Sequence, residues 1–436
     1  MLGYYLSLAL KSLRRSPVLT TLMVLSIGVG VALSMTTWQL VRMVSRDPIP
    51  EKSANLYVPQ IDVWGGRAGN NSGSSHEPPN LLDYGAVTAL LGDHRAKLQS
   101  AIYLISSIVT PHVNEGRPFN SVGFAVSREF FPMLNVPFIH GGTWSMDDET
   151  ARAQVVVISQ EVNRKVFGGG DNVGKILNID GHSYRVAGIL SNWNPEPVFY
   201  DVPATGGFLL QTPGVFLPFD VAITEKIPNA GETDCKVPPS QSGFDGLLHS
   251  SCVWISYIVE LDTANAFKEY KLYLEGVAHE RYSWPPNVRL RNLMSWLDYL
   301  QVVPDSFNIL WMVGFGLLVV CVVDTIGLML AKFLSRNLEI SVRRALGATR
   351  PAIYAQILTE GAVIGAAGGI TSFPLTWLGL LWVRSRAPRG WELLTSVDVG
   401  LFILALAVAV IATLLASLYP AWRSAQVQPA WQLKSN

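Results

Sequence analysis

Residues 336–358 read RNLEISVRRALGATRPAIYAQIL and form a basic segment between two long apolar runs, 307–331 and 352–383. The segment carries one acid, Glu339, and four arginines: Arg336, Arg343, Arg344 and Arg350. Each apolar run exceeds the about 20 residues that a helix needs to cross a bilayer. Because short loops rich in Lys and Arg stay on the cytoplasmic side, we expect this segment inside the cell.

Two further apolar runs, 18–41 and 399–419, bring the expected spans to four. Between the first and second spans lies a long segment, 45–305, of ordinary soluble composition. The sequence therefore predicts an α-helical membrane protein with four transmembrane helices and a large mixed α/β extracytoplasmic domain inserted between the first two spans. The formal net charge of +0 averages unlike parts, and we expect membrane lipids, not nucleic acid, around this chain.

The expected organisation follows from these runs. In chain order it is an amphipathic cytoplasmic interface helix at 1–16, spans at 17–44, 306–333, 352–383 and 398–420, the extracytoplasmic domain at 45–305, a cytoplasmic loop at 334–351, an outer loop at 384–397 and a cytoplasmic tail at 421–436. Most Lys and Arg near the ends of the spans lie at the ends expected in the cytoplasm, which favours a cytoplasmic location for both termini. Arginines in the outer loop are the exception, and we expect them to meet lipid phosphates or acids of the domain.

The segment 45–305 has strand-like and helix-like runs, and its length favours two subdomains. Expected strands are Leu56–Val63, Ala101–Thr110, Val155–Ile158, Ile176–Ile179, Tyr184–Ile189 and Val253–Leu261; expected helices are Asn80–Leu91, Gln160–Phe167 and Thr263–Glu275. Apolar residues from Leu293 to Val303 follow one helical stripe, which would rest on the membrane surface or on a neighbour. The Pro-, Gly- and Ser-rich piece 226–250 is an expected exposed loop.

One segment imitates a nucleotide site. Residues 169–175, GGDNVGK, have the spacing of a phosphate-binding loop, yet Ile176 stands where such a loop needs Ser or Thr. The sequence also runs from a helix-like stretch into a hairpin-like pair of strands, the reverse of the order that points a helix N-terminus at phosphate. We therefore expect no nucleotide here.

No catalytic or metal-binding pattern is apparent in the sequence. The seven histidines lie in the soluble segment, and none pairs with another at metal-ligand spacing. The acidic run 147–149 is interpreted as a solvated turn. Cys235 and Cys252 would form a disulfide if this segment faces an oxidising compartment, and this alternative stays open.

Two acids lie within the spans, Asp324 and Glu360. A charged carboxylate there is costly, so we expect Asp324 to be neutral, hydrogen-bonded or turned into a helix interface. The alternative interpretation is a proton or ion relay, with Glu360 or Thr325 as the second polar group. Glycines in the first and third spans favour close helix packing; they are Gly28, Gly30, Gly361, Gly365, Gly368 and Gly369.

The basic segment resembles the R-x-x-E-I-x-x-R-x-A-x-G-A signature of ABC permeases of the MacB and FtsX-like class. The stretches SREFFPMLNVPFIHGG and VFGGGDNVGKILNIDGHSYRVAGIL resemble the periplasmic core domain of that class, and YPAWRSAQVQPAWQLK resembles its closing segment. These similarities cover nearly the whole chain in the right order. No Walker motif accompanies them, so we expect the ATPase on a separate polypeptide.

The resemblance implies a non-catalytic, dimeric permease subunit in the bacterial inner membrane. It implies that Arg336, Glu339, Arg343, Arg344 and Arg350 lie at or near the ATPase contact, with Ala345 and Gly347 allowing close approach. ATP and Mg²⁺ would bind the partner ATPase, and this chain would hold no cofactor. The second permease would be identical or related, and a periplasmic adaptor and outer-membrane channel would be further partners.

Four functions remain open at this point. The first is export or efflux of a substrate from the periplasm or outer leaflet, by mechanical transmission of ATPase motion. A lipoprotein-releasing permease and an FtsX-like regulator of a cell-wall hydrolase share the topology. A membrane-anchored enzyme with its site in 45–305 belongs to a different class, and copurification of an ATPase would disfavour it.

Overall fold

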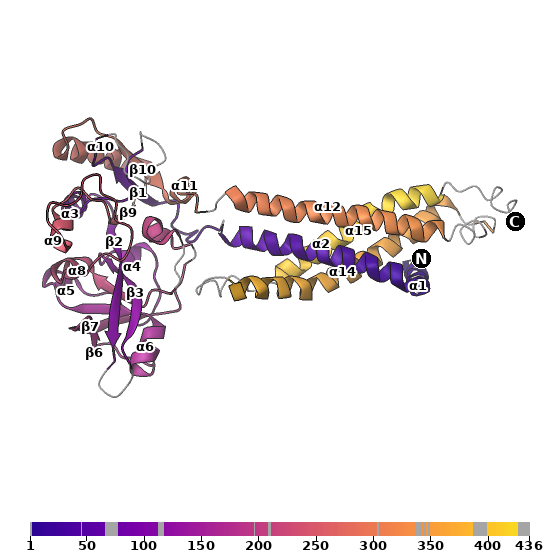
Figure 1. The fold of residues 1–436 in the computed structure, drawn as a ribbon, viewed down its shortest axis with the longest axis horizontal. Helices are drawn as coiled ribbons and strands as arrows, with labels where there is room; N and C mark the ends of the chain where they lie inside the picture. Colours follow the sequence, from indigo (N-terminus) through magenta and orange to yellow (C-terminus); the bar gives the residue numbers. More distant parts are fainter. Residues whose placement is uncertain are drawn as a thin grey trace. The chain divides into compact units, whose positions relative to one another are not determined.

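The computed structural model describes two compact units, which are treated separately below (Figure 1). Unit 1 comprises Met1–Ser45 and Pro304–Asn436, and unit 2 comprises Arg46–Val303. The residues described are 2–44, 46–65, 77–111, 117–195, 197–207, 211–302, 305–335, 342, 346–347, 349–386 and 399–425. The predicted insertion of a soluble domain between the first two spans is confirmed.

Unit 1 consists of long helices. They are α1 (Leu2–Arg15), α2 (Pro17–Val44), α12 (Asp305–Leu334), α14 (Arg350–Arg386) and α15 (Val399–Ala425). The last four contain segments long and apolar enough to cross a membrane: Pro17–Gln39, Ile309–Leu334, Arg350–Trp382 and Gly400–Arg423. The fold class predicted from the sequence, with four such helices, is thereby confirmed.

The apolar part of the third span ends at Trp382, next to the expected end at residue 383. The helix itself extends slightly further, because α14 continues through Arg384 and ends at Arg386. Arginine is a good helix former, and Pro388 follows two residues later in the sequence, where it disfavours continuation. The rest of the expected outer loop lies outside the described residues.

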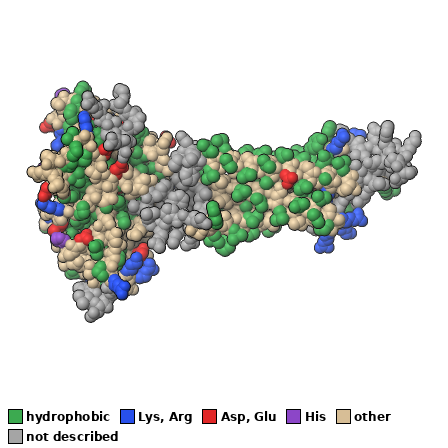
Figure 2. All heavy atoms as spheres, viewed as in Figure 1, with side chains coloured by type: hydrophobic (Ala, Val, Ile, Leu, Met, Phe, Trp, Pro, Cys, Tyr) green, Lys and Arg blue, Asp and Glu red, His purple; other side chains and the backbone are tan. Residues whose placement is uncertain are grey.

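The helices of unit 1 approach closely at glycines, as predicted. A Cβ added at Gly365 on α14 would lie 2.1 Å from Thr413 Oγ1 on α15, and one at Gly28 on α2 would lie 2.7 Å from Thr371 Oγ1 on α14. Only a residue without a side chain fits at such distances. On the face shown in Figure 2, hydrophobic side chains spread along the helices and Lys and Arg gather at one end of them.

Unit 2 is built on one ten-stranded sheet. The strands are β1 (Leu56–Ile61), β2 (Leu98–Thr110), β3 (Phe119–Val126), β4 (Phe138–Gly141), β5 (Val155–Ile158), β6 (Ile176–Ile179), β7 (His182–Leu190), β8 (Val215–Pro218), β9 (Ser256–Glu260) and β10 (Val288–Asn292). Their order is β10-β1-β9-β2-β3-β8-β5-β7-β4, with β6 paired to β2 and β7. The pairs β3–β8 and β5–β7 are parallel, and the other pairs among the described strands are antiparallel.

Helices cover both faces of this sheet. They are α3 (Tyr84–Asp93), α4 (Phe130–Met133), α5 (Met146–Thr150), α6 (Gln160–Phe167), the 3-10 turn η1 (Phe199–Asp201), α7 (Val202–Thr205), α8 (Phe219–Thr224), α9 (Phe244–Leu248), α10 (Ala264–Arg281) and α11 (Leu293–Tyr299). Successive β2 residues alternate between two apolar cores: Tyr103 and Ile105 belong to one, Ile102 and Leu104 to the other. Side chains of a strand point alternately to opposite faces, so both faces are buried.

All the described strands of unit 2 belong to one sheet, and its long strand β2, of 13 residues, pairs with β3, β6 and β9. The expected division of this unit into two subdomains stays a prediction. Strands β5 and β6 and helix α6 have the expected bounds. The strands not expected from the sequence are short, interrupted by Gly or charged, namely β3, β4, β8 and β10.

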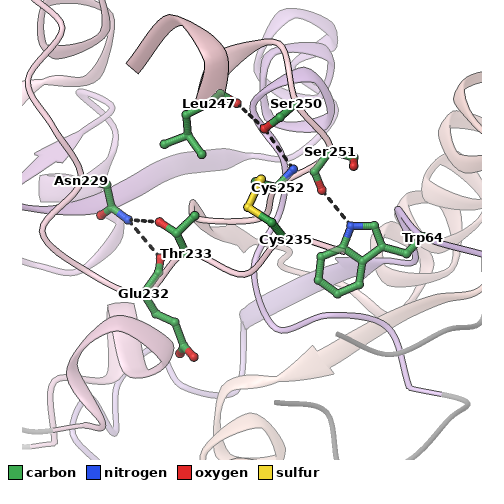
Figure 3. The surroundings of a disulfide bond; sticks show 9 residues. All are labelled: Trp64, Asn229, Glu232, Thr233, Cys235, Leu247, Ser250, Ser251 and Cys252. Carbon is green, nitrogen blue, oxygen red and sulfur yellow. Dashed lines mark hydrogen bonds between the residues drawn. A yellow bond between two sulfur atoms is a disulfide. The ribbon is translucent and has the colours of Figure 1, made fainter. Parts of the chain in front are cut away.

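A disulfide closes the expected loop 226–250. Cys235 and Cys252 are bonded, with their Cα atoms 4.3 Å apart. Beside the bridge the Trp64 indole Nε1–H donates to the Ser251 carbonyl at 2.8 Å, and the Cys252 N–H donates to Ser250 Oγ at 3.2 Å (Figure 3). Asp234 and Val253 exchange two backbone hydrogen bonds, which holds the ends of the loop together. The bridge thus fixes a segment with little regular structure.

Candidate functional site

The basic segment singled out from the sequence connects α12 to α14 in unit 1. α12 ends at Leu334 and α14 begins at Arg350. Arg336, Glu339, Arg343, Arg344 and Ala345 lie outside the described residues. Their predicted contact with an ATPase therefore stays a prediction. Ser335, Val342, Leu346, Gly347 and Thr349 are described and give the local geometry of the segment.

The described part of this segment is a helical turn with exposed apolar side chains. The Leu346 N–H donates to the Val342 carbonyl at 3.0 Å, and the Leu346 and Val342 side chains are 83% and 44% exposed. Gly347 has φ +100°, a conformation that L side chains rarely adopt, so it ends the turn where another residue would be strained. Exposed apolar side chains beside arginines are typical of a protein contact.

α14 begins with a regular first turn. The Thr349 carbonyl accepts hydrogen bonds from the N–H groups of Ala352 at 3.1 Å and Ile353 at 3.3 Å, as in the first turn of a helix. Arg350, the first residue of α14, is exposed. Its guanidinium therefore remains available for a contact with another molecule.

Beneath the segment, α12, α14 and α2 share an apolar cluster. It includes Met329 and Phe333 of α12, Ile353 and Ile357 of α14 and Met23 of α2. The cluster also surrounds a buried ion pair between Lys332 and Glu360, whose side chains are each 1% exposed. Ser12 Oγ of α1 donates to Glu360 Oε1 at 2.6 Å. Both helices that flank the segment are thus anchored next to it.

Asp324 is hydrogen-bonded to a side chain of a neighbouring helix. It lies exposed on α12, and Ser26 Oγ of α2 donates to its Oδ2 at 3.2 Å. Thr325 donates to the Cys321 carbonyl of its own helix at 2.7 Å, and Glu360 pairs with Lys332. In the described residues, the two side chains considered for a relay thus bond to other partners than Asp324. Residue spacing within one helix could not reveal Ser26, because it comes from a helix 298 positions earlier.

In unit 2, the strands at the two ends of the domain are paired. β1 and β10 are antiparallel, with Tyr57 opposite Asn292. Asn292 Nδ2 donates to the carbonyls of Ser53 at 2.9 Å and Ala54 at 3.1 Å, and its Oδ1 caps α11 by accepting the Met294 N–H at 3.0 Å. The chain that arrives from α2 and the chain that leaves towards α12 are therefore hydrogen-bonded side by side.

α11 completes this junction within unit 2. Its apolar stripe was expected on the membrane surface or on a neighbour, and Leu293, Trp296 and Leu297 are buried in the core of unit 2. The neighbour is thus the sheet itself. Because α11 packs into the core through these side chains, a displacement of the chain at the end of β10 would also displace the sheet.

Comparisons with known proteins match both units. A model of the MacB-like periplasmic core domain matches residues 20–243, half of the chain, and a model of the FtsX-like permease C-terminal domain matches residues 311–429. The chain belongs to the MacB-like, FtsX-like family of ABC transporter permeases. The resemblance inferred from the basic segment and the outer-domain stretches is confirmed.

Several known proteins are similar to this permease. It is 22% identical over 418 residues to the macrolide export ATP-binding/permease protein MacB of Chromobacterium violaceum, covering 94% of this chain and 57% of that protein. It is 23% identical to the uncharacterized ABC transporter permease YvrN of Bacillus subtilis, covering 80% of this chain and 78% of that one. The periplasmic region of MacB from Actinobacillus actinomycetemcomitans aligns with 58% of the chain at 13% identity and a TM-score of 0.37.

The glycine-lysine segment of the permease has the geometry expected of a structural turn. α6 ends at Phe167 and is capped by Gly168 in the left-handed region, and Gly169, Gly170 and Gly174 also have positive φ. Lys175 then leads into β6, and its Nζ lies 5.5 Å from the centre of the Phe167 ring. A helix C-terminus, not an N-terminus, faces the turn, which is the wrong end for phosphate.

Unit 2 of the permease also holds a buried acid that the sequence did not single out. Asp201 in η1 accepts a hydrogen bond from Ser256 Oγ of β9 at 2.6 Å, and burial raises its pKa from 3.8 to about 7. Its side chain is fully enclosed between β2, β9 and η1. Within the described residues, no group of three or more His, Cys, Asp or Glu side chains could hold a metal ion.

Proposed function

We propose that this permease transmits ATP-driven closure of separate cytoplasmic ATPase subunits to its extracytoplasmic unit 2. The ATPase subunits would bind ATP and Mg²⁺, and the permease would contribute no hydrolytic residue. Two permeases, identical or related, would act together in the bacterial inner membrane with both termini in the cytoplasm. The chain covers 57% of the length of its MacB relative from Chromobacterium violaceum, so its partners are part of this proposal.

The carrying observation is the exposed turn between α12 and α14. Val342 and Leu346 offer apolar surface, and Arg350 adds a positive charge at the start of α14. Arg336, Glu339, Arg343 and Arg344 would flank this surface and fix the orientation of the ATPase. Gly347 holds the turn in a conformation that a side chain would strain. A partner that pressed here would act on two spans at once.

Export or efflux from the periplasm or outer leaflet is the favoured outcome of this motion. Relatives are named for macrolide export and for pyoverdine export, which supports small-molecule cargo. Unit 2 would change conformation through its paired end strands, β1 and β10. A periplasmic adaptor and an outer-membrane channel would complete the route in a double-membrane envelope.

The test reverses charge at the turn. The variant Arg343→Glu/Arg344→Glu should lose copurification of the ABC ATPase, and with it the ATP-dependent change in hydrogen exchange of α11. Each lost contact with a carboxylate partner would cost about 1.5–3 kcal/mol, enough together to lower affinity more than a hundredfold. Exchange rates in β2 and β9 report whether unit 2 stays folded.

A matched control reverses the same number of charges elsewhere. Lys268 and Lys271 are exposed on α10 in unit 2, so Lys268→Glu/Lys271→Glu should leave ATPase copurification unchanged. Full ATPase binding and a full exchange response in the Arg343→Glu/Arg344→Glu variant would refute the proposed coupling contact.

A further inference from the structure

Inside unit 1 one ion pair is almost completely removed from solvent. Lys332 is in the last turn of α12 and Glu360 is on α14, and each side chain is 1% exposed. Ser12 of α1 donates to the same carboxylate oxygen, Oε1, at 2.6 Å. Side chains from three helices therefore meet at one carboxylate.

Because it is buried, this pair is expected to restrict the relative position of α12 and α14 more than it stabilises the fold. Removing two charges from water costs energy that their attraction repays only with good geometry, so a buried pair often adds little net stability. Loss of one partner, however, leaves an uncompensated buried charge. The pair therefore fixes how α12 lies against α14, since a displacement that separates the charges is expensive.

The surrounding apolar residues lie on the same helix faces as the pair. On α14, Ile353, Ile357, Glu360 and Ile364 are spaced by three or four residues, and the three isoleucines belong to the shared cluster. On α12, Met329 of the same cluster lies three residues before Lys332. Residues at this spacing share one face of a helix. The ion pair is thus set inside the apolar contact, where water cannot compete.

Lys332 and Glu360 lie on the two sides, in sequence, of the segment proposed to contact the ATPase. Leu334, at the end of α12, lies two residues after Lys332, and Arg350, the start of α14, lies ten residues before Glu360. Away from this point, α12 packs chiefly on α2 and α15, and α14 packs on α15, α2 and α1. The ion pair links α12 directly to α14 next to the segment. A force applied to the segment by a partner would therefore act on this link.

We propose that Lys332 and Glu360 are positioning residues that make α12 and α14 respond to the ATPase as one body. This inference rests on the proposed function. The ion pair holds the two helices in fixed register at the base of the segment, and Ser12 ties α1 to the same point. Without the pair, the ATPase still binds, but its displacement is absorbed by sliding of α12 against α14. Unit 2 then receives little of it.

The experiment uses the full permease with its copurified ATPase in nanodiscs. Lys332→Met/Glu360→Met removes both charges and retains apolar packing, so the protein should fold and bind the ATPase. The ATP-dependent change in hydrogen exchange of α11 should fall by about tenfold, in the range by which single sites alter coupling between distant sites. Lys332→Glu/Glu360→Lys, which restores a pair with reversed polarity, should recover most of the response.

Two further variants sharpen the result. Glu360→Gln leaves Lys332 without a countercharge and should lose the response without losing copurification of the ATPase. Ser372→Ala is the matched control, because Ser372 is a buried polar residue of α14 whose hydroxyl donates within its own helix, to Gly369 O at 2.8 Å. It should respond like the unmodified permease.

The outcomes separate this inference from the proposed function. A normal response in Lys332→Met/Glu360→Met overturns the positioning role and leaves the proposed function standing. If that variant fails to assemble, Lys332→Glu/Glu360→Lys decides between the outcomes. An exchange response of α11 as low as that of Glu360→Gln overturns the positioning role, and a recovered response supports it. An unmodified permease that shows no ATP-dependent change in α11 refutes the proposed function itself.

Discussion

Unit 1 and unit 2 bury charge in different ways. In unit 1 both members of the Lys332–Glu360 pair are 1% exposed. In unit 2 the Glu260 carboxylate is 4% exposed, but its partners Lys52 and Lys97 are 20% and 53% exposed. The pKa of Lys97 is raised to about 12, first by its hydrogen bond to Glu260. Water can solvate the exposed lysines of unit 2 if they leave Glu260. Lys332 and Glu360 have no such substitute, so the helices that carry them are restricted to the position that keeps the pair together.

The two units also differ in what can move. Unit 2 is a sheet with both faces covered, and a shift of one residue in strand register would turn every side chain to the other face. Unit 1 is a set of helices that meet at glycines, and packed helices can slide by small steps. Unit 2 therefore suits the part that is moved, and unit 1 the part that moves it. Three predictions probe this comparison.

The largest expected effect concerns Asp201, the acid enclosed in unit 2. Because its folded pKa of about 7 lies above the unfolded value of 3.8, the fold favours the neutral carboxyl. Its contribution to stability is complete below about pH 4, declines as pH rises, and is lost above about pH 7. The pKa difference corresponds to on the order of 4 kcal/mol. Asp201→Asn should remove this dependence.

Urea unfolding of the full permease at pH 5 and pH 8, followed by the fluorescence of unit 2 tryptophans, measures the effect. Asp201→Asn should be more stable than the unmodified protein at pH 8, since the amide carries no charge and can still accept from Ser256. Equal loss of stability between pH 5 and pH 8 in both proteins would show that burial of Asp201 does not control it.

The next effect concerns the bridge that closes the loop of unit 2. Reduction of Cys235–Cys252 should destabilise unit 2 by about 3 kcal/mol, because the unfolded chain regains the freedom of a loop. Urea midpoints with and without dithiothreitol measure it, and Cys235→Ser/Cys252→Ser should no longer respond. Cys321→Ser is the control, since Cys321 is a free thiol on α12. A response to reductant in the double variant would contradict the prediction.

The smallest effect tests the glycine contacts of unit 1. Gly365→Ala should destabilise by about 1–3 kcal/mol, because the added Cβ would meet Thr413 and the Val410 backbone of α15. Gly316→Ala on α12 is the matched control: its Cβ meets nothing within 4 Å, and alanine in a helix is favoured by up to about 1 kcal/mol. Thermal unfolding in detergent compares them. Equal shifts would refute close packing at Gly365.

The site was only partly accessible from sequence. The position of the basic segment between two spans is a local property that the lengths of the apolar runs report. The left-handed conformation of Gly347 is visible only in the structure. The buried pair was not found, although Lys332 and Glu360 stand on opposite sides of the segment. The signal that could have found it is the coincidence of a Lys near the end of one apolar run with a Glu inside the next.

The sequence by itself determined the four spanning helices, the inserted domain and the family. These follow from the length of apolar runs and from contiguous motifs, because crossing a bilayer requires a minimum local length. Only the tertiary structure decided that β1 pairs with β10, that one sheet unites unit 2, and that Glu360 faces Lys332 while Asp324 faces Ser26. Such pairings join distant residues, and the energy of burying them together depends on the whole fold.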